Sequence, residues 1–188
     1  MDIVRVPQAT KAQPQILAGD IAFVDYSDKG GPFRHRVLFD CYAISLVQQG
    51  QKQIYRAGGD TVLKPGQGML IPEGNSIIAE HSDTSSLYSS FIVFFPGHLG
   101  KQFVQSAAKA NAPYLHFESN AYIQDHVSHM RSLIHKRHVL SADMAKLKVQ
   151  ELLTALHELS PDILSAVFNS HHNTLKAIVE KHLLGALT

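Results

Sequence analysis

Histidine is the side chain in this sequence whose type and spacing could most readily do chemistry. The 188 residues include 12 histidines, and imidazole is the commonest metal ligand in proteins and titrates near neutral pH. His126 and His129 lie three residues apart, as do His135 and His138, so each pair could share one face of a helix and hold a metal ion. Charged neighbours such as Asp125 favour a solvated helix face instead, and we predict no metal site there.

Nucleophilic catalysis has no visible carrier in the sequence. No Gly-x-Ser-x-Gly turn is present to expose a serine, and the glycines of 58–59 and 66–68 do not precede helices as phosphate-binding loops do. Cys41 is the only cysteine, which excludes an intramolecular disulfide. With Asp40 and Tyr42 beside it in a strand-like run, Cys41 is expected to be a buried, unreactive thiol. We therefore expect no catalytic residues, no cofactor and no enzyme activity.

The composition is that of a globular domain without a strong charge. Hydrophobic residues make up 45% and charged residues 18% of the chain, and 17 basic against 16 acidic residues give a net charge of +1. A domain that binds nucleic acid by itself usually has a marked basic excess. The N-terminus lacks the pattern of a secretory signal, and the longest apolar run, 91–95, is far shorter than the roughly 20 residues that span a bilayer. We expect a cytoplasmic protein without a membrane partner.

The first half of the chain alternates short apolar runs with turn residues, as all-β sandwiches and barrels do. Gly50 and the glycines within 57–60 mark tight turns, because glycine adopts positive φ without steric cost. The predicted strands cover residues 16–26, 37–47, 51–56, 61–63, 68–71, 76–80 and 87–95.

After Pro96 the apolar residues change to helical spacing. One predicted helix places apolar residues at intervals of four, three and four, with Ser119 or Asn120 as its N-cap. Its stripe consists of Ile123, Val127, Met130 and Ile134. A second predicted helix follows Ser141 and stops before Pro161. Its heptad stripe consists of Ala145, Val149, Leu152, Leu156 and Leu159.

Two parts of the chain resemble AraC-type bacterial transcription regulators. Residues 44–54 and 59–74, with turns at Gly50 and Pro65-Gly66, resemble the core of the arm-and-barrel domain of that family, which is a cupin. Residues 172–188 resemble the opening helix of its helix-turn-helix domain. The resemblance implies an α+β, mainly β fold: a cupin-like double-stranded β-helix barrel followed by a C-terminal helical dimerisation region.

The resemblance also implies a division of labour along the chain. Residues 1–97 would form a cupin-like sensor barrel with an N-terminal arm, and 98–168 the helical dimerisation region. Residues 169–188 would form a linker and the first helix of a truncated DNA-binding domain. The implied function is effector sensing and dimerisation in a regulator, an activator by family habit, whose full-length form binds promoter DNA. A homodimer is expected, with DNA contacted only through the missing C-terminal domain.

Metal-dependent cupin enzymes are the main alternative. In their second motif, Gly-x5-Pro-x-Gly-x2-His, this chain supplies Gly66, Pro72 and Gly74, but the ligand position falls on Ile77, which has no lone pair to give. Their first motif would place its carboxylate at Ala43. We predict no metal in the barrel.

The barrel interior could hold an apolar effector. Strand alternation places Tyr42, Ile44 and Leu46 on one face, and Met69 and Ile71 on one face of their own strand. The predicted effector pocket consists of Tyr42, Ile44, Leu46, Tyr55, Met69, Ile71, Tyr88 and Phe91. These side chains could instead simply fill a small barrel, and the sequence does not choose between a small molecule and a partner protein as effector.

The heptad stripe is the predicted dimer interface, at Val149, Leu152, Leu156 and Leu159. Apolar residues at a and d positions are buried when a partner helix packs against them. The same stripe could pack within the chain onto the barrel, so both interpretations remain open. A protein-interaction module controlled by a partner protein is the remaining alternative function.

Overall fold

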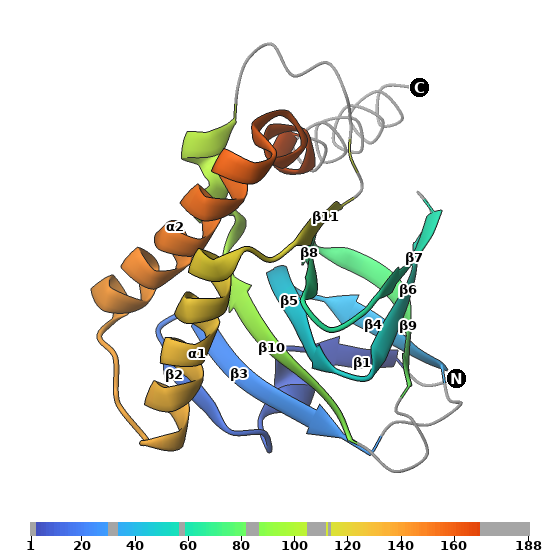
Figure 1. The fold of residues 1–188 in the computed structure, drawn as a ribbon, viewed down its shortest axis with the longest axis horizontal. Helices are drawn as coiled ribbons and strands as arrows, with labels where there is room; N and C mark the ends of the chain where they lie inside the picture. The colour runs from blue at the N-terminus through green and yellow to red at the C-terminus, as the bar shows by residue number, and fades with distance from the viewer. Residues whose placement is uncertain are drawn as a thin grey trace, which may run out of the picture.

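The computed structural model describes residues 3–29, 34–56, 59–81, 87–104, 112 and 114–169. Two β-sheets face each other and form a barrel, and the helices pack on one side of it (Figure 1). This confirms the predicted mainly β, cupin-like barrel followed by helices.

The strands divide between a five-stranded and a six-stranded sheet. The first sheet contains β1 (Ile3–Val6), β4 (Arg34–Phe39), β6 (Gln51–Arg56), β7 (Gly59–Leu63) and β9 (Gly74–His81), in the order β1-β4-β9-β6-β7. The second contains β2 (Gln15–Ala18), β3 (Ile21–Asp28), β5 (Tyr42–Gln49), β8 (Gln67–Ile71), β10 (Tyr88–Phe95) and β11 (Leu115–Glu118), in the order β11-β8-β5-β10-β3-β2. Neighbouring strands are antiparallel, except that β1 runs parallel to β4.

In the structure, two of the predicted strands are each divided into two strands by a turn. The run 16–26 contains a two-residue turn between β2 and β3, where Gly19 has a φ of 64°, a conformation that glycine adopts readily. The run 37–47 is interrupted at Asp40 and Cys41, between β4 and β5. Apolar residues on both sides of each turn hid these breaks in the sequence.

The six-stranded sheet is buried on both faces. In β5, Ala43 and Val47 belong to the apolar cluster between the two sheets. Tyr42, Ile44 and Leu46 belong to a second cluster, between this sheet and the helices. This explains why β5 and β10 read as nearly continuous apolar runs.

The helices begin where their capping residues predict. The described helical segments are η1 (Gln8–Thr10), η2 (Gly97–Phe103), α1 (Ala121–His135), α2 (Ala142–Leu159) and a helical stretch at 161–169. Asn120 Oδ1 accepts a hydrogen bond from Ile123 N at 2.9 Å, and Ser141 Oγ accepts one from Met144 N at 3.2 Å. Both predicted helices and the N-caps Asn120 and Ser141 are confirmed.

A buried carboxylate attaches α1 to the barrel. Asp25 of β3 is 8% exposed. It accepts a hydrogen bond from Arg131 Nε at 2.9 Å, and His135 Nε2 lies 2.6 Å from its other oxygen. Charge-assisted hydrogen bonds of this kind are stronger than neutral ones, so they fix the orientation of α1 on the sheet.

A polar cluster joins α1 to α2 around Glu151. Tyr122 Oη and Lys148 Nζ donate hydrogen bonds to its carboxylate at 3.0 and 2.9 Å, and Nδ1 of the buried His126 lies 3.4 Å from it. Burial lowers the pKa of His126. Burial acts to raise the pKa of Glu151, but the hydrogen bond from Lys148 and the other contacts outweigh it and bring that pKa to about 2.

The predicted dimer stripe packs within the chain. Val149, Leu152 and Leu156 are at most 1% exposed and belong to the cluster between the six-stranded sheet and the helices, whereas Leu159 is 41% exposed. The intramolecular alternative therefore describes the three buried residues.

The predicted boundary at residue 97 does not coincide with the end of the barrel. The interval 98–168, predicted as a helical region, contributes β11 to the barrel sheet through its pairing with β8. Residues 170–188, which contain the predicted linker and the opening helix of the DNA-binding domain, lie outside the described residues.

Truncating the stripe should destabilise the monomer. We expect Leu152→Ala to lower the free energy of unfolding by about 2 to 5 kcal/mol, because it leaves a cavity in a packed core. Ile163→Ala, at a position in the helical stretch 161–169 that is 46% exposed, is the matched control and should change it by less than about 0.5 kcal/mol. Urea denaturation measures both, and equal effects would show that the stripe is not part of the core.

The α1–α2 cluster should make the domain acid-sensitive. The carboxyl of Glu151 titrates near 4.5 when unfolded but near 2 when folded, so the unfolded state binds the proton first and stability falls as the pH drops through this window. His126, whose pKa is lowered from 6.5, acts in the same direction below that pH. Glu151→Gln should flatten the loss of stability between pH 4.5 and 2, measured by urea midpoints. Glu158→Gln, at an exposed position of the same helix, should leave the loss unchanged.

Candidate functional site

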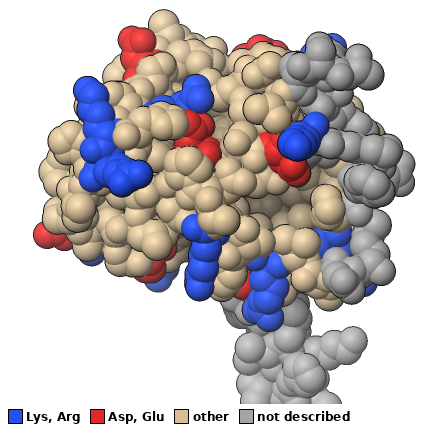
Figure 2. Space-filling model, turned by 90° about the horizontal axis from the view of Figure 1, so that it is seen from below, with Lys and Arg blue, Asp and Glu red and all other residues tan. Residues whose placement is uncertain are grey.

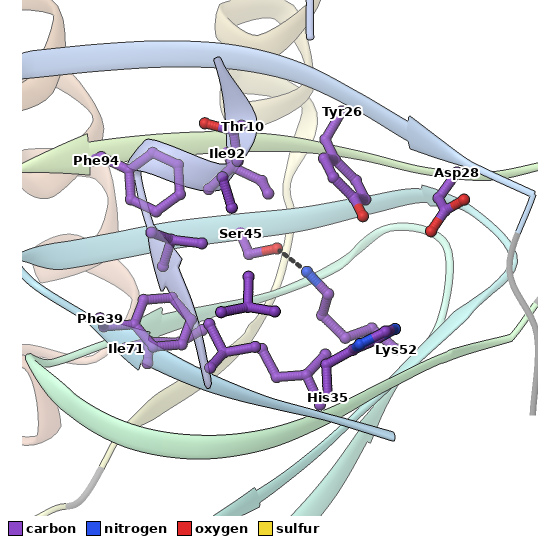
Figure 3. A pocket seen from close by; sticks show the side chains of 15 residues that line it. Thr10, Tyr26, Asp28, His35, Phe39, Ser45, Lys52, Ile71, Ile92 and Phe94 are labelled. Carbon is purple, nitrogen blue, oxygen red and sulfur yellow. Dashed lines mark hydrogen bonds between the residues drawn. The ribbon is translucent and has the colours of Figure 1, made fainter. Parts of the chain in front are cut away.

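A cavity of about 230 Å³ lies between the two sheets. Nine of its 15 lining residues are apolar. These nine come from β1, η1, β4, β8, β9 and β10. The polar ones are Thr10, Tyr26, Asp28, His35, Ser45 and Lys52. Phe39 and Phe94 lie at one end of the cavity, and Tyr26, Asp28 and His35 lie toward the other (Figure 3).

A buried ammonium group forms part of the cavity wall. Lys52 is 3% exposed, because alternation along β6 directs it inward together with Ile54. Its Nζ donates a hydrogen bond to Ser45 Oγ at 3.3 Å (Figure 3). The same atom lies 5.4 Å from the centroid of the Tyr88 ring. Burying a charge is costly unless polar or aromatic groups stabilise it, and Ser45 and Tyr88 are two such groups beside the Lys52 amine.

The N-terminal segment closes one side of the cavity. Val6 and Thr10 line it, and Thr10 Oγ1 donates a hydrogen bond to Pro7 O at 2.8 Å. Arg5 binds Asp40, in the turn between β4 and β5, through two hydrogen bonds of 2.8 and 3.2 Å. The hydrogen bond from Arg5 lowers the pKa of that carboxyl. Arg5 thus binds the N-terminal segment to the surface of the barrel, while Val6 and Thr10 of the same segment line the cavity.

Comparison with known proteins places this barrel in a family. The family model described as the ExsA N-terminal regulatory domain matches residues 42–166. The chain belongs to the ExsA N-terminal regulatory domain family. This is a regulatory domain of AraC-family regulators, which confirms the resemblance seen in the sequence.

Solved structures of ToxT from Vibrio cholerae share the fold of this ExsA-type domain. Apo ToxT K231A aligns with a TM-score of 0.56 at 9% identity, over 81% of this chain and 60% of that one. Wild-type ToxT bound to an unsaturated fatty acid aligns with a TM-score of 0.51 at 10% identity, over 76% and 56%. ToxT bound to (E)-4-(8-methylnaphthalen-1-yl)but-3-enoic acid gives 0.51 at 6%, over 78% and 60%. The domain spans about 60% of the length of these chains, and a comparison with curated proteins finds no match.

The predicted effector residues of the ExsA-type domain are divided between two faces. Only Ile71 lines the cavity, while Met69 and Tyr88 lie in the same cluster between the sheets. The other four strand residues of the six-stranded sheet face the helices and were assigned to the wrong side: Tyr42, Ile44, Leu46 and Phe91. Tyr55 is half-buried and alternates with the inward-facing Ile54.

Sequence reasoning missed the polar residues of the cavity. Ser45 stands two residues from the buried Ala43 and from the buried Val47, and Lys52 stands two residues before the buried Ile54. A polar residue in phase with buried ones on a strand is the signal that would have found both.

The histidines do not gather into a metal site in the described part of the chain. His126 faces Glu151 and His135 faces Asp25, whereas His129 and His138 are exposed. No group of three or more His, Cys, Asp or Glu side chains is arranged to hold an ion among the described residues. Ile77, at the cupin ligand position, is 38% exposed. No described helix is long and apolar enough to cross a membrane.

Cys41 should react slowly with thiol reagents. Its partial burial, together with the nearby carboxylate of Glu73, raises the pKa of the thiol from 9.0 to about 11. At pH 8 the reactive thiolate is therefore roughly a hundredfold scarcer than in a free cysteine. We expect iodoacetamide to alkylate the folded domain at least about fiftyfold more slowly than the urea-unfolded chain, as followed by mass spectrometry, and similar rates would contradict this environment.

Proposed function

We propose that this domain senses a small apolar molecule that carries an anionic head, and that it acts by binding and not by catalysis. The observation that carries the proposal is the buried Lys52 side chain in the wall of a mostly apolar cavity. A carboxylate placed there would gain a charge-assisted hydrogen bond in a poorly solvated site. The apolar part of the ligand would lie toward Phe39 and Phe94 (Figure 3).

The ligands of the ToxT structures support this class of molecule. Both an unsaturated fatty acid and a naphthalenyl butenoic acid join an apolar body to a carboxylic acid. The cavity of about 230 Å³ is smaller than the roughly 300 to 1,000 Å³ of typical ligand pockets. We therefore propose a short-chain or compact acid for this domain.

Binding would reach the helices through the six-stranded sheet. Ser45 lines the cavity, while its neighbours Ile44 and Leu46 contact the helical layer. A shift of β5 would therefore change the packing on both faces of the sheet. We propose that this changes how a full-length AraC-type activator dimerises or presents its DNA-binding domain in the cytoplasm. We propose the sensor barrel for 1–97 together with β11, which the helical interval 98–168 contributes to it, and the connection to DNA binding for 169–188.

A homodimer needs a surface other than the three buried residues of the stripe, Val149, Leu152 and Leu156. Met144 and Leu147 of α2 are 45% and 58% exposed, and they lie three residues apart on one side of the helix. We propose this outer side of α2 as the contact between copies.

Calorimetric titration with octanoate and with 1-octanol tests the role of Lys52. The two probes share the same chain and differ in the anionic head, so octanoate should bind at least about tenfold more tightly, as one charge-assisted hydrogen bond predicts. Lys52→Met should abolish this preference, because it retains the apolar stem and removes the charge. Lys64→Met, at an exposed position, should leave it unchanged. The proposal is wrong if acid and alcohol bind equally to the wild type, or if folded Lys52→Met keeps the preference.

A further inference from the structure

The strand β2 forms an edge of the six-stranded sheet. It pairs with β3, from Gln15 opposite Val24 to Ala18 opposite Ile21, and no other described strand follows it in the sheet. Natural edge strands are commonly protected by charged residues or proline. Within β2 the residues are Gln15, Ile16, Leu17 and Ala18, none of which is charged. This edge is therefore chemically open to pairing with another strand.

The hairpin register shows which backbone groups of β2 are directed outward. Asp25 N donates a hydrogen bond to Pro14 O at 2.9 Å, which marks these two residues as a hydrogen-bonded pair. Hydrogen-bonded and non-hydrogen-bonded pairs alternate along antiparallel strands. Ile16 and Ala18 therefore use their backbone groups toward β3, whereas the N–H and C=O groups of Gln15 and Leu17 point away from it.

A groove of about 600 Å³ runs between this part of the chain and the end of α1. Residues 12–17 form one wall and residues 134–139, except Lys136, form the other. Leu17 and Val139 at its rim are 62% and 89% exposed. The groove thus combines an extended edge with two exposed apolar side chains, which is the arrangement that an added peptide strand requires.

The groove also has a basic character. Arg137, His135 and His138 line it, and none of its lining residues in the described chain is acidic. His135 already contacts Asp25, so Arg137 is the permanent charge available to a partner. Seen from below, lysine and arginine side chains are spread over the face of the molecule with aspartate and glutamate among them (Figure 2), so the basic character of the groove rests on its own lining residues.

The backbone presents Arg137 in an uncommon way. Arg137 N donates to Ile134 O at 2.9 Å and His138 N donates to Leu133 O at 3.0 Å, which is the Schellman pattern of a helix end. Arg137 occupies its left-handed position with a φ of 55°, where glycine is usual. These bonds engage the carbonyl groups of Leu133 and Ile134 in the last turn of α1, and the next turn of the chain presents Arg137 at the wall of the groove.

We propose that this groove binds an extended acidic segment of a partner protein, which adds a strand to β2. The backbone of the segment pairs with Gln15 and Leu17. Its apolar side chains lie on the face of the sheet to which Leu17 points, and its carboxylates lie on the helical face, where one of them binds Arg137. A nucleic acid would use the charge of Arg137 but not the edge hydrogen bonds, so the exposed strand favours a peptide. This surface lies outside the cavity and does not depend on the proposed effector.

A fluorescent peptide of alternating glutamate and valine, six residues long, tests the proposal on the full chain. A peptide with lysine in place of glutamate is the charge control. We expect the acidic peptide to bind at least about tenfold more tightly than the basic one in fluorescence anisotropy, a difference of about 1.4 kcal/mol. Arg137→Gly should reduce its affinity by about tenfold without unfolding the domain, because glycine suits this backbone conformation. Lys146→Ala, which removes a charge from α2 outside the groove, should not reduce it.

Hydrogen exchange distinguishes strand addition from simple charge attraction. On saturation with the acidic peptide, the amides of Gln15 and Leu17 should become protected by at least about tenfold, whereas that of Ile16, already paired with β3, should change little. Unchanged exchange at Gln15 and Leu17 would overturn the proposal, as would equal binding of the basic peptide or full affinity in folded Arg137→Gly. Displacement of the acidic peptide by an equally charged DNA oligonucleotide would identify a general polyanion site and also overturn it. So would protection of the same amides by self-association without peptide, since the edge would then bind a second copy.

Discussion

The six-stranded sheet is the constraint on which the rest of this domain depends, because it is buried on both of its faces. One face forms the inside of the barrel and the other carries the helices. Every residue of β5 from Tyr42 to Val47 is buried, so a side chain cannot change size or polarity without affecting one of two cores. Close-packed interiors tolerate such changes poorly. The cavity at Ser45 and the helical layer are consequently joined through a single strand.

The pattern of the sequence was sufficient for the architecture because local signals were strong. The change from short apolar runs to helical spacing after Pro96 separates the barrel strands from α1 and α2, with β11 as the exception. The caps at Asn120 and Ser141 fix where the helices start. These features depend on neighbouring residues and on backbone chemistry, which a single sequence contains in full.

The same pattern could not assign the faces of the sheet or the use of the heptad stripe. In a strand buried on both sides, both sets of alternate residues are apolar, and nothing in Tyr42, Ile44 and Leu46 distinguishes the helical side from the cavity. Likewise, an apolar stripe such as Val149, Leu152 and Leu156 looks alike whether it packs on a partner or on its own barrel. What covers an apolar face is decided by tertiary contacts far apart in sequence. The polar exceptions Ser45 and Lys52 held the missing information about the cavity.

The strand β3 brings the separate features of the molecule into contact. Its inward side contributes Tyr26 and Asp28 to the cavity, and its outward side contributes Asp25, which holds Arg131 and His135 of α1. Along one edge it pairs with β10, and along the other with β2, whose free side faces the groove. Tyr26 and Asp25 are neighbours on this strand and point to opposite faces of the sheet, so the wall of the cavity and the anchor of α1 share one stretch of backbone. The cavity, the helical layer and the groove therefore all border a single eight-residue strand.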